Sequence, residues 1–287
     1  MKRTKRVLGL ALAAVMCIGL LAGCGENPSS SDTADDASGA ETSEKVLNIA
    51  TIGETTTLSP LYMIADNRPT QKLLYEGLVK YVDGEIQPVL AEDWELSEDG
   101  TQLTFYLRQG VTFHDGEPFN AEAAIANIES WHINPSFASL PGVVNYTNIE
   151  AVDEYTIRLT YDTPYFAYIN DFCWPDVCTM ISPKLITQGD FQTVNGYAGT
   201  GPYVYDEYVA GQYTTFVRNE NYWGEQPYYD KIVAKYIPDN ASRVQALQTG
   251  EIDLIYGSAE LSYEDYNQAT AIEGIEGKFA PSGSTIR

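Results

Sequence analysis

The stretch 197–223, which reads YAGTGPYVYDEYVAGQYTTFVRNENYW, constrains the fold more than any other part of the sequence. Gly199 and Gly201 can take positive φ, and Pro202 fixes the direction of the chain. These residues predict a sharp turn that exposes backbone N–H groups, with an ordinary turn of no further role as the alternative. Two alternating, aromatic-rich runs follow, so a β-hairpin is expected after the turn.

A two-residue loop at Ala210-Gly211 would join these runs and fix their register. Large side chains would then face one another on both faces of the hairpin. The expected pairs are Tyr208 with Tyr213, Val204 with Val217, Tyr205 with Phe216, and Tyr203 with Arg218.

Residues 1–23 have the pattern of an export signal. Four basic residues within positions 2–6 precede an uncharged run over 7–21, shorter than the roughly 20 residues that a spanning helix needs. The run ends in Leu-Ala-Gly-Cys, which resembles the bacterial lipobox and implies cleavage before Cys24 and lipid attachment to it. A free cysteine after a plain secretory signal is the alternative.

Residues 24–44 are predicted to form a lipid-anchored, disordered linker. From residue 25 onwards this segment has no aromatic or branched aliphatic side chain, so it cannot bury enough apolar surface to offset its ordering entropy. A lipid at one end and a solvated linker would hold the folded part outside the membrane but close to it.

The charge of the chain excludes one class of partner. Removing the four positive charges of the signal from the formal net charge of −23 leaves −27 for the remaining chain. A surface this acidic repels phosphate groups, so neither nucleic acid nor anionic lipid is expected as a partner.

Two cysteines remain for disulfide formation outside the cell, Cys173 and Cys178. Five residues of extended strand span roughly 17 Å, so the chain must turn at Pro175 before the two can pair. Two buried free thiols are the alternative. The spacing is not that of a redox motif or a zinc site.

Two kinds of sequence pattern alternate along 45–287 and predict two lobes. A pattern of alternating strands and helices begins with a strand at 46–50 and a helix that starts at Pro69, and the same pattern is found again after residue 196. Between them lie Asp-Gly turns at 83, 99 and 115 and short alternating strands, typical of an antiparallel meander. We therefore expect a discontinuous main α/β lobe at 45–74 and 196–287, with an α+β subdomain inserted at 75–195.

Capping residues predict helices in both parts. Asn120 is expected to cap a helix in the inserted subdomain, and Asp239 or Asn240 a helix in the main lobe that ends at Gly250. A strand is expected to follow at 252–256. Because the chain leaves the main lobe and re-enters it, at least two connections join the two parts, which is typical of hinged proteins.

Several motifs in these regions together resemble family 5 extracellular solute-binding proteins, the oligopeptide, dipeptide and nickel-chelate receptors of ABC importers. Their order and spacing match as well, and the resemblance covers residue 46 to the end. The motifs are Tyr75-Glu76-Gly77-Leu78, 88–94, 107–111 leading into 113–122, Gly199-Thr200-Gly201-Pro202-Tyr203, 218–223, and Gly250-Glu251-Ile252-Asp253.

The resemblance implies a periplasmic-binding-protein fold of the Venus-flytrap type II kind, which closes on its ligand between two lobes. Complete members are much longer, so the sequence is identified as a fragment that lacks the second main lobe. The implied partners are a peptide or small chelate and the permease subunits of an ABC importer, with contact to the membrane only through the lipid. No cofactor is implied.

Loops at strand ends supply the candidate ligand-binding residues. Arg68 is expected to pair with a ligand carboxylate, Trp174 to form a flat apolar wall, and the turn at Thr200 and Gly201 to donate backbone hydrogen bonds. Asp176, in the loop of Trp174, completes the set. For each residue a structural role is the alternative: a surface ion pair for the arginine and core packing for the tryptophan.

Ligand identity is left open between two classes. Nickel-type relatives look most similar in 218–223 and 237–257, but they carry arginines in the segment aligned with 175–181, where this chain has Asp176, Val177 and Thr179. Peptides are therefore the first expectation, and a nickel chelate is the second.

An enzyme is the distant alternative, together with a cell-surface scaffold. The sequence has neither G-x-S-x-G nor H-E-x-x-H, and its two histidines, His114 and His132, lie in unrelated segments. His114, in a Phe-His-Asp-Gly turn, is expected to be structural, with its ring bound to local backbone. No catalytic activity is expected.

Overall fold

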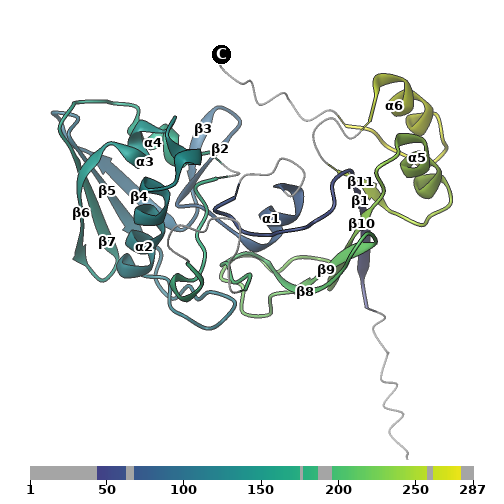
Figure 1. The fold of residues 1–287 in the computed structure, drawn as a ribbon, viewed down its shortest axis with the longest axis horizontal. Coiled ribbons are helices and arrows are strands. Elements are labelled where there is room, and N and C mark those ends of the chain that lie inside the picture. Colours follow the sequence, from purple (N-terminus) through teal and green to yellow (C-terminus); the bar gives the residue numbers. More distant parts are fainter. Residues whose placement is uncertain (1–43, 63–67, 175–176, 187–195, 257–260, 279–287) are drawn as a thin grey trace, which may run out of the picture. The chain divides into compact units, whose positions relative to one another are not determined.

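A computed structural model describes residues 44–62, 68–174, 177–186, 196–256 and 261–278 (Figure 1). The chain divides into two compact units, 1–42 and 43–287, and every described residue belongs to the second. The predicted signal and residues 24–43 of the linker, including Cys24, lie outside the described residues. Across the described ranges, no helix combines the length and apolar character needed to cross a bilayer.

A five-stranded mixed sheet is built from both ends of the folded chain (Figure 1). Its strand order is β11-β1-β10-β9-β8, with β1 parallel to both β10 and β11 and the other neighbours antiparallel. Alternating branched and aromatic side chains favour these strands. The strands are β1 (Val46–Thr51), β8 (Tyr203–Val209), β9 (Tyr213–Arg218), β10 (Lys231–Tyr236) and β11 (Leu254–Ile255).

Three helices accompany this sheet: α1 (Arg68–Leu74), α5 (Asn240–Gln248) and α6 (Tyr263–Thr270). Helix α1 contacts β8, while α5 contacts both β11 and α6. The Asp239 side chain caps α5 by accepting from the N–H of Ser242, and Gly250 follows the helix with a φ of 71°. Both helix signals are therefore confirmed, with Asp239 rather than Asn240 as the cap.

A four-stranded antiparallel sheet lies wholly within 75–195, in the order β4-β5-β7-β6, next to a two-stranded hairpin. Gly84, Gly100 and Gly116 all have positive φ, which confirms the three Asp-Gly turns. The strands are β2 (Val79–Val82), β3 (Glu85–Pro88), β4 (Ala91–Leu96), β5 (Gln102–Leu107), β6 (Tyr146–Asp153) and β7 (Thr156–Tyr161).

One face of this sheet is apolar and is covered by α2 (Ala121–His132). Phe105 of β5 and Ile157 of β7 are fully buried in the same core as Trp131 of the helix. Asn120 caps the helix at Ala123 N, as predicted. The remaining short helices are the α-helices α3 (Pro141–Val144) and α4 (Tyr168–Phe172) and the 3₁₀ turns η2 (Pro135–Phe137) and η3 (Pro183–Leu185).

The β8–β9 hairpin matches most of the predicted register. Tyr203 with Arg218, Val204 with Val217, and Tyr205 with Phe216 are paired as expected. Beyond Tyr205 the register shifts. A bulge at Asp206 takes up one extra residue on β8, so the partner of Tyr208 is Thr214 rather than Tyr213.

The loop of this hairpin is correspondingly longer than expected. Val209 pairs with Tyr213, which leaves three residues between the strands, and Gly211 takes a φ of 69°. A three-residue loop with one left-handed glycine is the next most common hairpin connection after the two-residue loop. The expected strand at 252–256 is also shorter in the structure, where only Leu254–Ile255 pair with β1.

Candidate functional site

The candidate site lies at one edge of the five-stranded sheet. Strands β1, β8 and β10 run in the same direction, because β1 is parallel to β10 and β9 is antiparallel to both β10 and β8. Their carboxyl ends therefore lie at the same edge. In open α/β sheets this is the edge at which ligands bind, in the loops that follow the strands.

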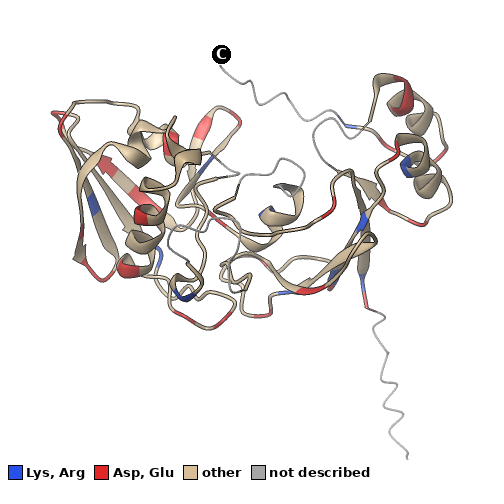
Figure 2. Cartoon of the chain, viewed as in Figure 1, with Lys and Arg blue, Asp and Glu red and all other residues tan. Residues whose placement is uncertain are grey.

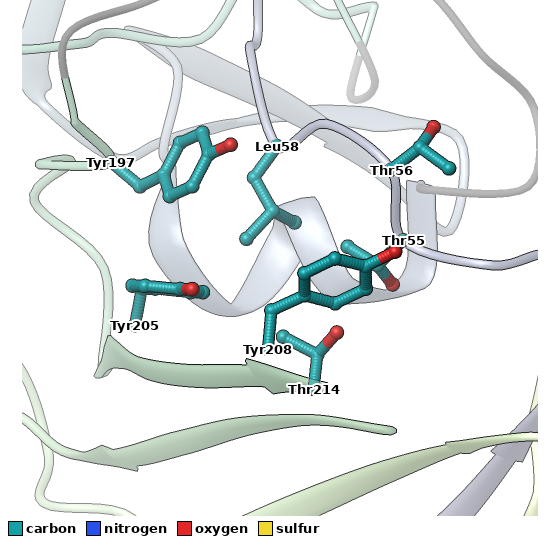
Figure 3. Close-up of a pocket in the computed structure, with 7 residues that line it drawn as sticks. All are labelled: Thr55, Thr56, Leu58, Tyr197, Tyr205, Tyr208 and Thr214. Carbon is teal, nitrogen blue, oxygen red and sulfur yellow. The ribbon is translucent and has the colours of Figure 1, made fainter. Parts of the chain in front are cut away.

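A pocket opens among these loops (Figure 3). It encloses about 220 Å³, including open solvent at its mouth. The segment after β1, the segment before β8, and the outer halves of β8 and β9 supply its walls. The lining residues are Thr55, Thr56, Leu58, Tyr197, Tyr205, Tyr208 and Thr214.

Glu54 ties the loop after β1 to the β8–β9 hairpin. Its carboxylate accepts hydrogen bonds from the hydroxyl of Tyr208 and from the N–H of Gly211, both at 2.6 Å. These two donors hold the pKa of Glu54 below its usual value, and the carboxylate raises the pKa of Tyr208 to about 12. One pocket wall is thus fastened to the other by a charge-assisted contact.

The other two tyrosines of the pocket have unused hydrogen-bonding capacity. The rings of Tyr197 and Tyr205 meet edge to face, with centroids 5.0 Å apart, and lie beside Leu58 (Figure 3). Within the described part of the chain, neither hydroxyl has a hydrogen-bond partner, in contrast to those of Tyr203 and Tyr208. Both can therefore donate to and accept from a bound group.

A second polar cluster, the Glu76 cluster, consists of Glu76, Thr200, Tyr222 and Trp223. The Thr200 and Tyr222 hydroxyls and the Trp223 indole N–H donate to the Glu76 carboxylate at 2.8–2.9 Å. Burial raises the pKa of Glu76, and the three donors oppose that shift. Arg108 stacks over the Trp223 ring, 4.3 Å from its centroid. The cluster joins three of the motifs found in the sequence.

His114 binds the glycine turn on both sides of its ring. Its Nε2 lies 2.9 Å from the carbonyl oxygen of Gly201, and its Nδ1 accepts from the N–H of Gly199 at 3.3 Å. These partners assign the proton to Nε2 in a neutral ring, and burial lowers the pKa of His114. The structural role expected for this residue is confirmed, although its backbone partners are distant in sequence rather than local.

The expected conformation of the turn is wrong, because Gly199 and Gly201 are not among the residues with positive φ. Glycine is needed there for a different reason. A Cβ on Gly201 would lie 2.7 Å from the carbonyl oxygens of Leu73 and Leu74, and one on Gly199 only 2.0 Å from that of Leu74. The turn packs directly on the backbone at the end of α1.

The turn is packed into the protein, and the ligand-binding role expected for Thr200 and Gly201 stays a prediction. Both residues are buried. The Thr200 hydroxyl binds Glu76, and the Gly201 N–H donates to the carbonyl oxygen of Leu74 at 2.9 Å. These two contacts give the turn a structural role.

The other predicted ligand-binding residues are not brought into the pocket by any observed contact. Trp174 is 45% exposed and lies in the loop after α4. Arg68 is the first residue of α1, and nothing is described of its side chain. Asp176 lies outside the described residues. All three remain predictions.

Cys173 and Cys178 are free and buried, so the disulfide considered from the sequence is not formed. The Cys173 thiol donates to the carbonyl oxygen of Ile169, and the Cys178 thiol to that of Asp171. Burial raises both thiol pKa values, that of Cys173 to about 11, so neither is a reactive thiolate at neutral pH.

Sequence reasoning missed most of the pocket. Only Tyr197 belonged to a candidate loop. The signal that was available is the hydroxyl-rich run 54–57 directly after the first strand, together with the tyrosines that alternate along β8. Among the described residues, no cluster of three or more histidine, cysteine, aspartate or glutamate side chains could hold a metal ion.

Comparison with known proteins places this geometry in a family. The family model "Bacterial extracellular solute-binding proteins, family 5 Middle" matches residues 85–286. The nickel-binding periplasmic protein of Escherichia coli (strain K12) is 37% identical over 209 residues, which cover 71% of this chain and 40% of that protein.

Solved structures show the same fold. NikA from Brucella suis in complex with Fe(III)-EDTA matches with a TM-score of 0.72 and 33% identity, over 78% of this chain and 46% of that one. DppA from Helicobacter pylori, an ABC transporter-associated periplasmic binding protein in complex with the peptide STSA, matches with a TM-score of 0.63 and 27% identity, over 72% and 45%.

This chain therefore spans less than half the length of these relatives. The family model matches most of the chain, which confirms the resemblance seen in the motifs: the chain belongs to family 5 of the bacterial extracellular solute-binding proteins.

Proposed function

We propose that this chain is the solute-binding part of an ABC importer, which captures oligopeptides or dipeptides outside the membrane and delivers them to the permease. Three observations support the proposal. The chain belongs to a family of extracellular solute-binding proteins. Its pocket lies at the carboxyl edge of the sheet. A structurally similar protein, DppA, is ABC transporter-associated and holds a peptide.

The observation that carries the peptide assignment is the uncharged lining of the pocket. All seven lining residues are threonine, tyrosine or leucine. The nearby Glu54 is occupied by Tyr208 and Gly211. Peptide groups and neutral side chains pair well with such hydroxyls, whereas the carboxylates of a metal chelate are best bound by arginine or lysine.

A nickel chelate is the second candidate. The similarity to the nickel-binding protein of Escherichia coli and to NikA favours it. The charge distribution of the described residues favours it less, because Asp and Glu are spread over both sheets and Lys and Arg are sparse (Figure 2). A chelate with net negative charge would have to overcome this field.

Three further side chains are proposed to contact the ligand. Arg68 would pair with a carboxylate, Trp174 would offer its exposed ring as an apolar wall, and Asp176 would accept from a ligand amine. Cys24 is proposed to carry the lipid that keeps the protein at the outer face of the membrane.

The test is to identify what the complete gene product carries. The protein would be purified without denaturation from its native host, and its small molecules analysed by mass spectrometry alongside metal analysis of the same sample. Short peptides in stoichiometric amount are the expected result. Nickel together with a small organic chelator would replace the peptide assignment with the second candidate. A sample that carries and binds neither class would contradict the transport role.

A further inference from the structure

We propose that the pocket of Figure 3 is a subsite that selects one small, uncharged polar side chain of the bound peptide, a hydroxyl or a carboxamide. This inference rests on the proposed function and extends it, because it states which peptides the protein prefers. The residues that would recognise the side chain are Tyr197, Tyr205 and Thr214.

The size of the pocket limits it to part of a ligand. Sites for whole small molecules enclose roughly 300 to 1,000 Å³. The cavity measures about 30 Å³ once the open solvent around it is left out. A complete peptide does not fit there, whereas the polar tip of one short side chain does.

The chemistry of the lining sets the class of that side chain. The hydroxyls of Tyr197 and Tyr205 have no partner among the described residues, and each can both donate and accept. Thr214 adds a hydroxyl from a residue that is only 2% exposed. A group that itself donates and accepts can satisfy all of them, while an aliphatic group would displace water from these hydroxyls without replacing its hydrogen bonds.

Charged side chains are disfavoured for two reasons. None of the seven lining residues carries a positive charge, so a carboxylate would exchange its hydration for neutral hydroxyl donors alone. Glu54, an acid beside the pocket, already accepts from Tyr208 and Gly211, and these two donors lower its pKa. A lysine or arginine would have to compete with those bonds and would lose its hydration on entry.

The pocket is also held in a fixed shape, as a selective site requires. Glu54 fastens the loop that carries Thr55, Thr56 and Leu58 to the hairpin that carries Tyr208. The Tyr197 ring is supported edge to face by Tyr205. Selection is therefore expected from preorganised groups rather than from a loop that adapts to each ligand.

The experiment uses the full-length protein and titration calorimetry with tetrapeptides. The probes are Ala-Ala-Ala-Ala, its four single-serine variants and its four single-aspartate variants. At one position serine should bind about three- to tenfold tighter than alanine, the effect of one or two good hydrogen bonds, and aspartate at that position should bind more weakly than alanine. Tyr205→Phe keeps the ring and should bring the serine-to-alanine ratio at that position close to one.

The matched control is Tyr213→Phe. Tyr213 lies on the same hairpin but outside the pocket, where its hydroxyl donates to Glu207 on the surface. This variant should keep the serine preference. Binding of all tetrapeptides without any serine preference, or a preference that persists in both Tyr205→Phe and Tyr197→Phe, would overturn the subsite and leave the peptide function standing. Failure of every tetrapeptide and of the dipeptide Ala-Ala to bind would overturn both.

Discussion

At the scale of single residues, some glycines are needed because the backbone of another segment lies close to them, and not because of an unusual dihedral angle. Gly201 shows this most clearly, because a methyl group there would meet the backbone of Leu73 and Leu74 at 2.7 Å. Backbone atoms at a helix end cannot move aside as a flexible side chain can. The position tolerates only glycine even though its φ is ordinary.

We predict that Gly201→Ala lowers the free energy of unfolding by about 3 kcal/mol, the upper part of the range for overpacking. Chemical denaturation of the full-length protein would measure it. Gly116→Ala is the control. Gly116 has a φ of 85° but open space around its Cβ position, so only the strain of a left-handed residue applies, about 1 kcal/mol. Equal losses would show that close approach is not what restricts Gly201.

His114 predicts a pH dependence of stability. Its neutral ring accepts from Gly199 and binds the carbonyl of Gly201, and burial lowers its pKa below the usual value of about 6.5. The unfolded chain therefore takes up a proton before the folded one does. The contribution of His114 is complete above about pH 6.5 and is lost as the pH falls from there through the lowered pKa.

Urea unfolding at pH 7.5, 6.5 and 5.5 would reveal this loss. In the wild type, the contribution of this one group to the free energy of unfolding should change with pH by at most about 1.4 kcal/mol per pH unit. The stability difference between wild type and His114→Gln should shrink as the pH falls. His132→Gln, at an exposed position, should leave the behaviour of His114 unchanged. A difference that stays constant with pH would contradict the neutral assignment.

At the scale of elements, the Glu76 cluster connects segments that the sequence separates widely. Glu76 follows α1, Thr200 precedes β8, and Tyr222 and Trp223 follow β9. All three donors meet one partly buried carboxylate. The cluster therefore connects the segment after α1, where the chain leaves the five-stranded sheet, with the segments that flank β8 and β9, where it returns.

We predict that Glu76→Gln destabilises the protein by about 1 to 3 kcal/mol, because its amide group must turn an N–H toward a donor that then stays unpaired. Tyr222→Phe in the Glu76→Gln background should add less than it does in the wild type, since both changes break the same network. Glu95→Gln is the control, because Glu95 accepts only a surface hydrogen bond from Tyr106. Thermal unfolding of the four variants would test the coupling, and strictly additive losses would argue against a shared network.

Local signals in the sequence predicted individual elements well. Asn120, Asp239 and the Asp-Gly turns specify structure through their own backbone, and all were correctly placed. The bulge at Asp206 was missed because it depends on how β8 fits β9. The contact of Thr200 with Glu76 was not anticipated, because the two residues are 124 positions apart in the sequence.

The pocket could not be predicted for a related reason. Its walls come from 55–58, from 197 and from both strands of the hairpin, which only the parallel pairing of β1 with β10 brings to one edge. No spacing rule connects such residues. Pattern and propensity describe neighbours along the chain, whereas this site is made of neighbours across the sheet.

At the scale of the whole molecule, the amino terminus is predicted to decide where the protein works. Cys24→Ser should abolish lipid attachment and give a soluble, uncleaved or differently processed protein, because this cysteine is the predicted site of both cleavage and lipid attachment. Cell fractionation and metabolic labelling with palmitate would measure this. A lipid-labelled, membrane-bound Cys24→Ser variant would contradict the assignment, and Cys173→Ser, at a buried thiol, is the matched control.

The strand order of the five-stranded sheet also sets an order of folding. The four-stranded sheet closes between residues 91 and 161, whereas β1 has no neighbour in its sheet until β10 and β11 have been made. Contacts so distant in sequence form slowly, because a long loop must close before they contribute. Pulse-labelled hydrogen exchange during refolding should protect the amides of β5 and β7 before those of β1. The first strand to leave the ribosome would then be among the last to be fixed in place.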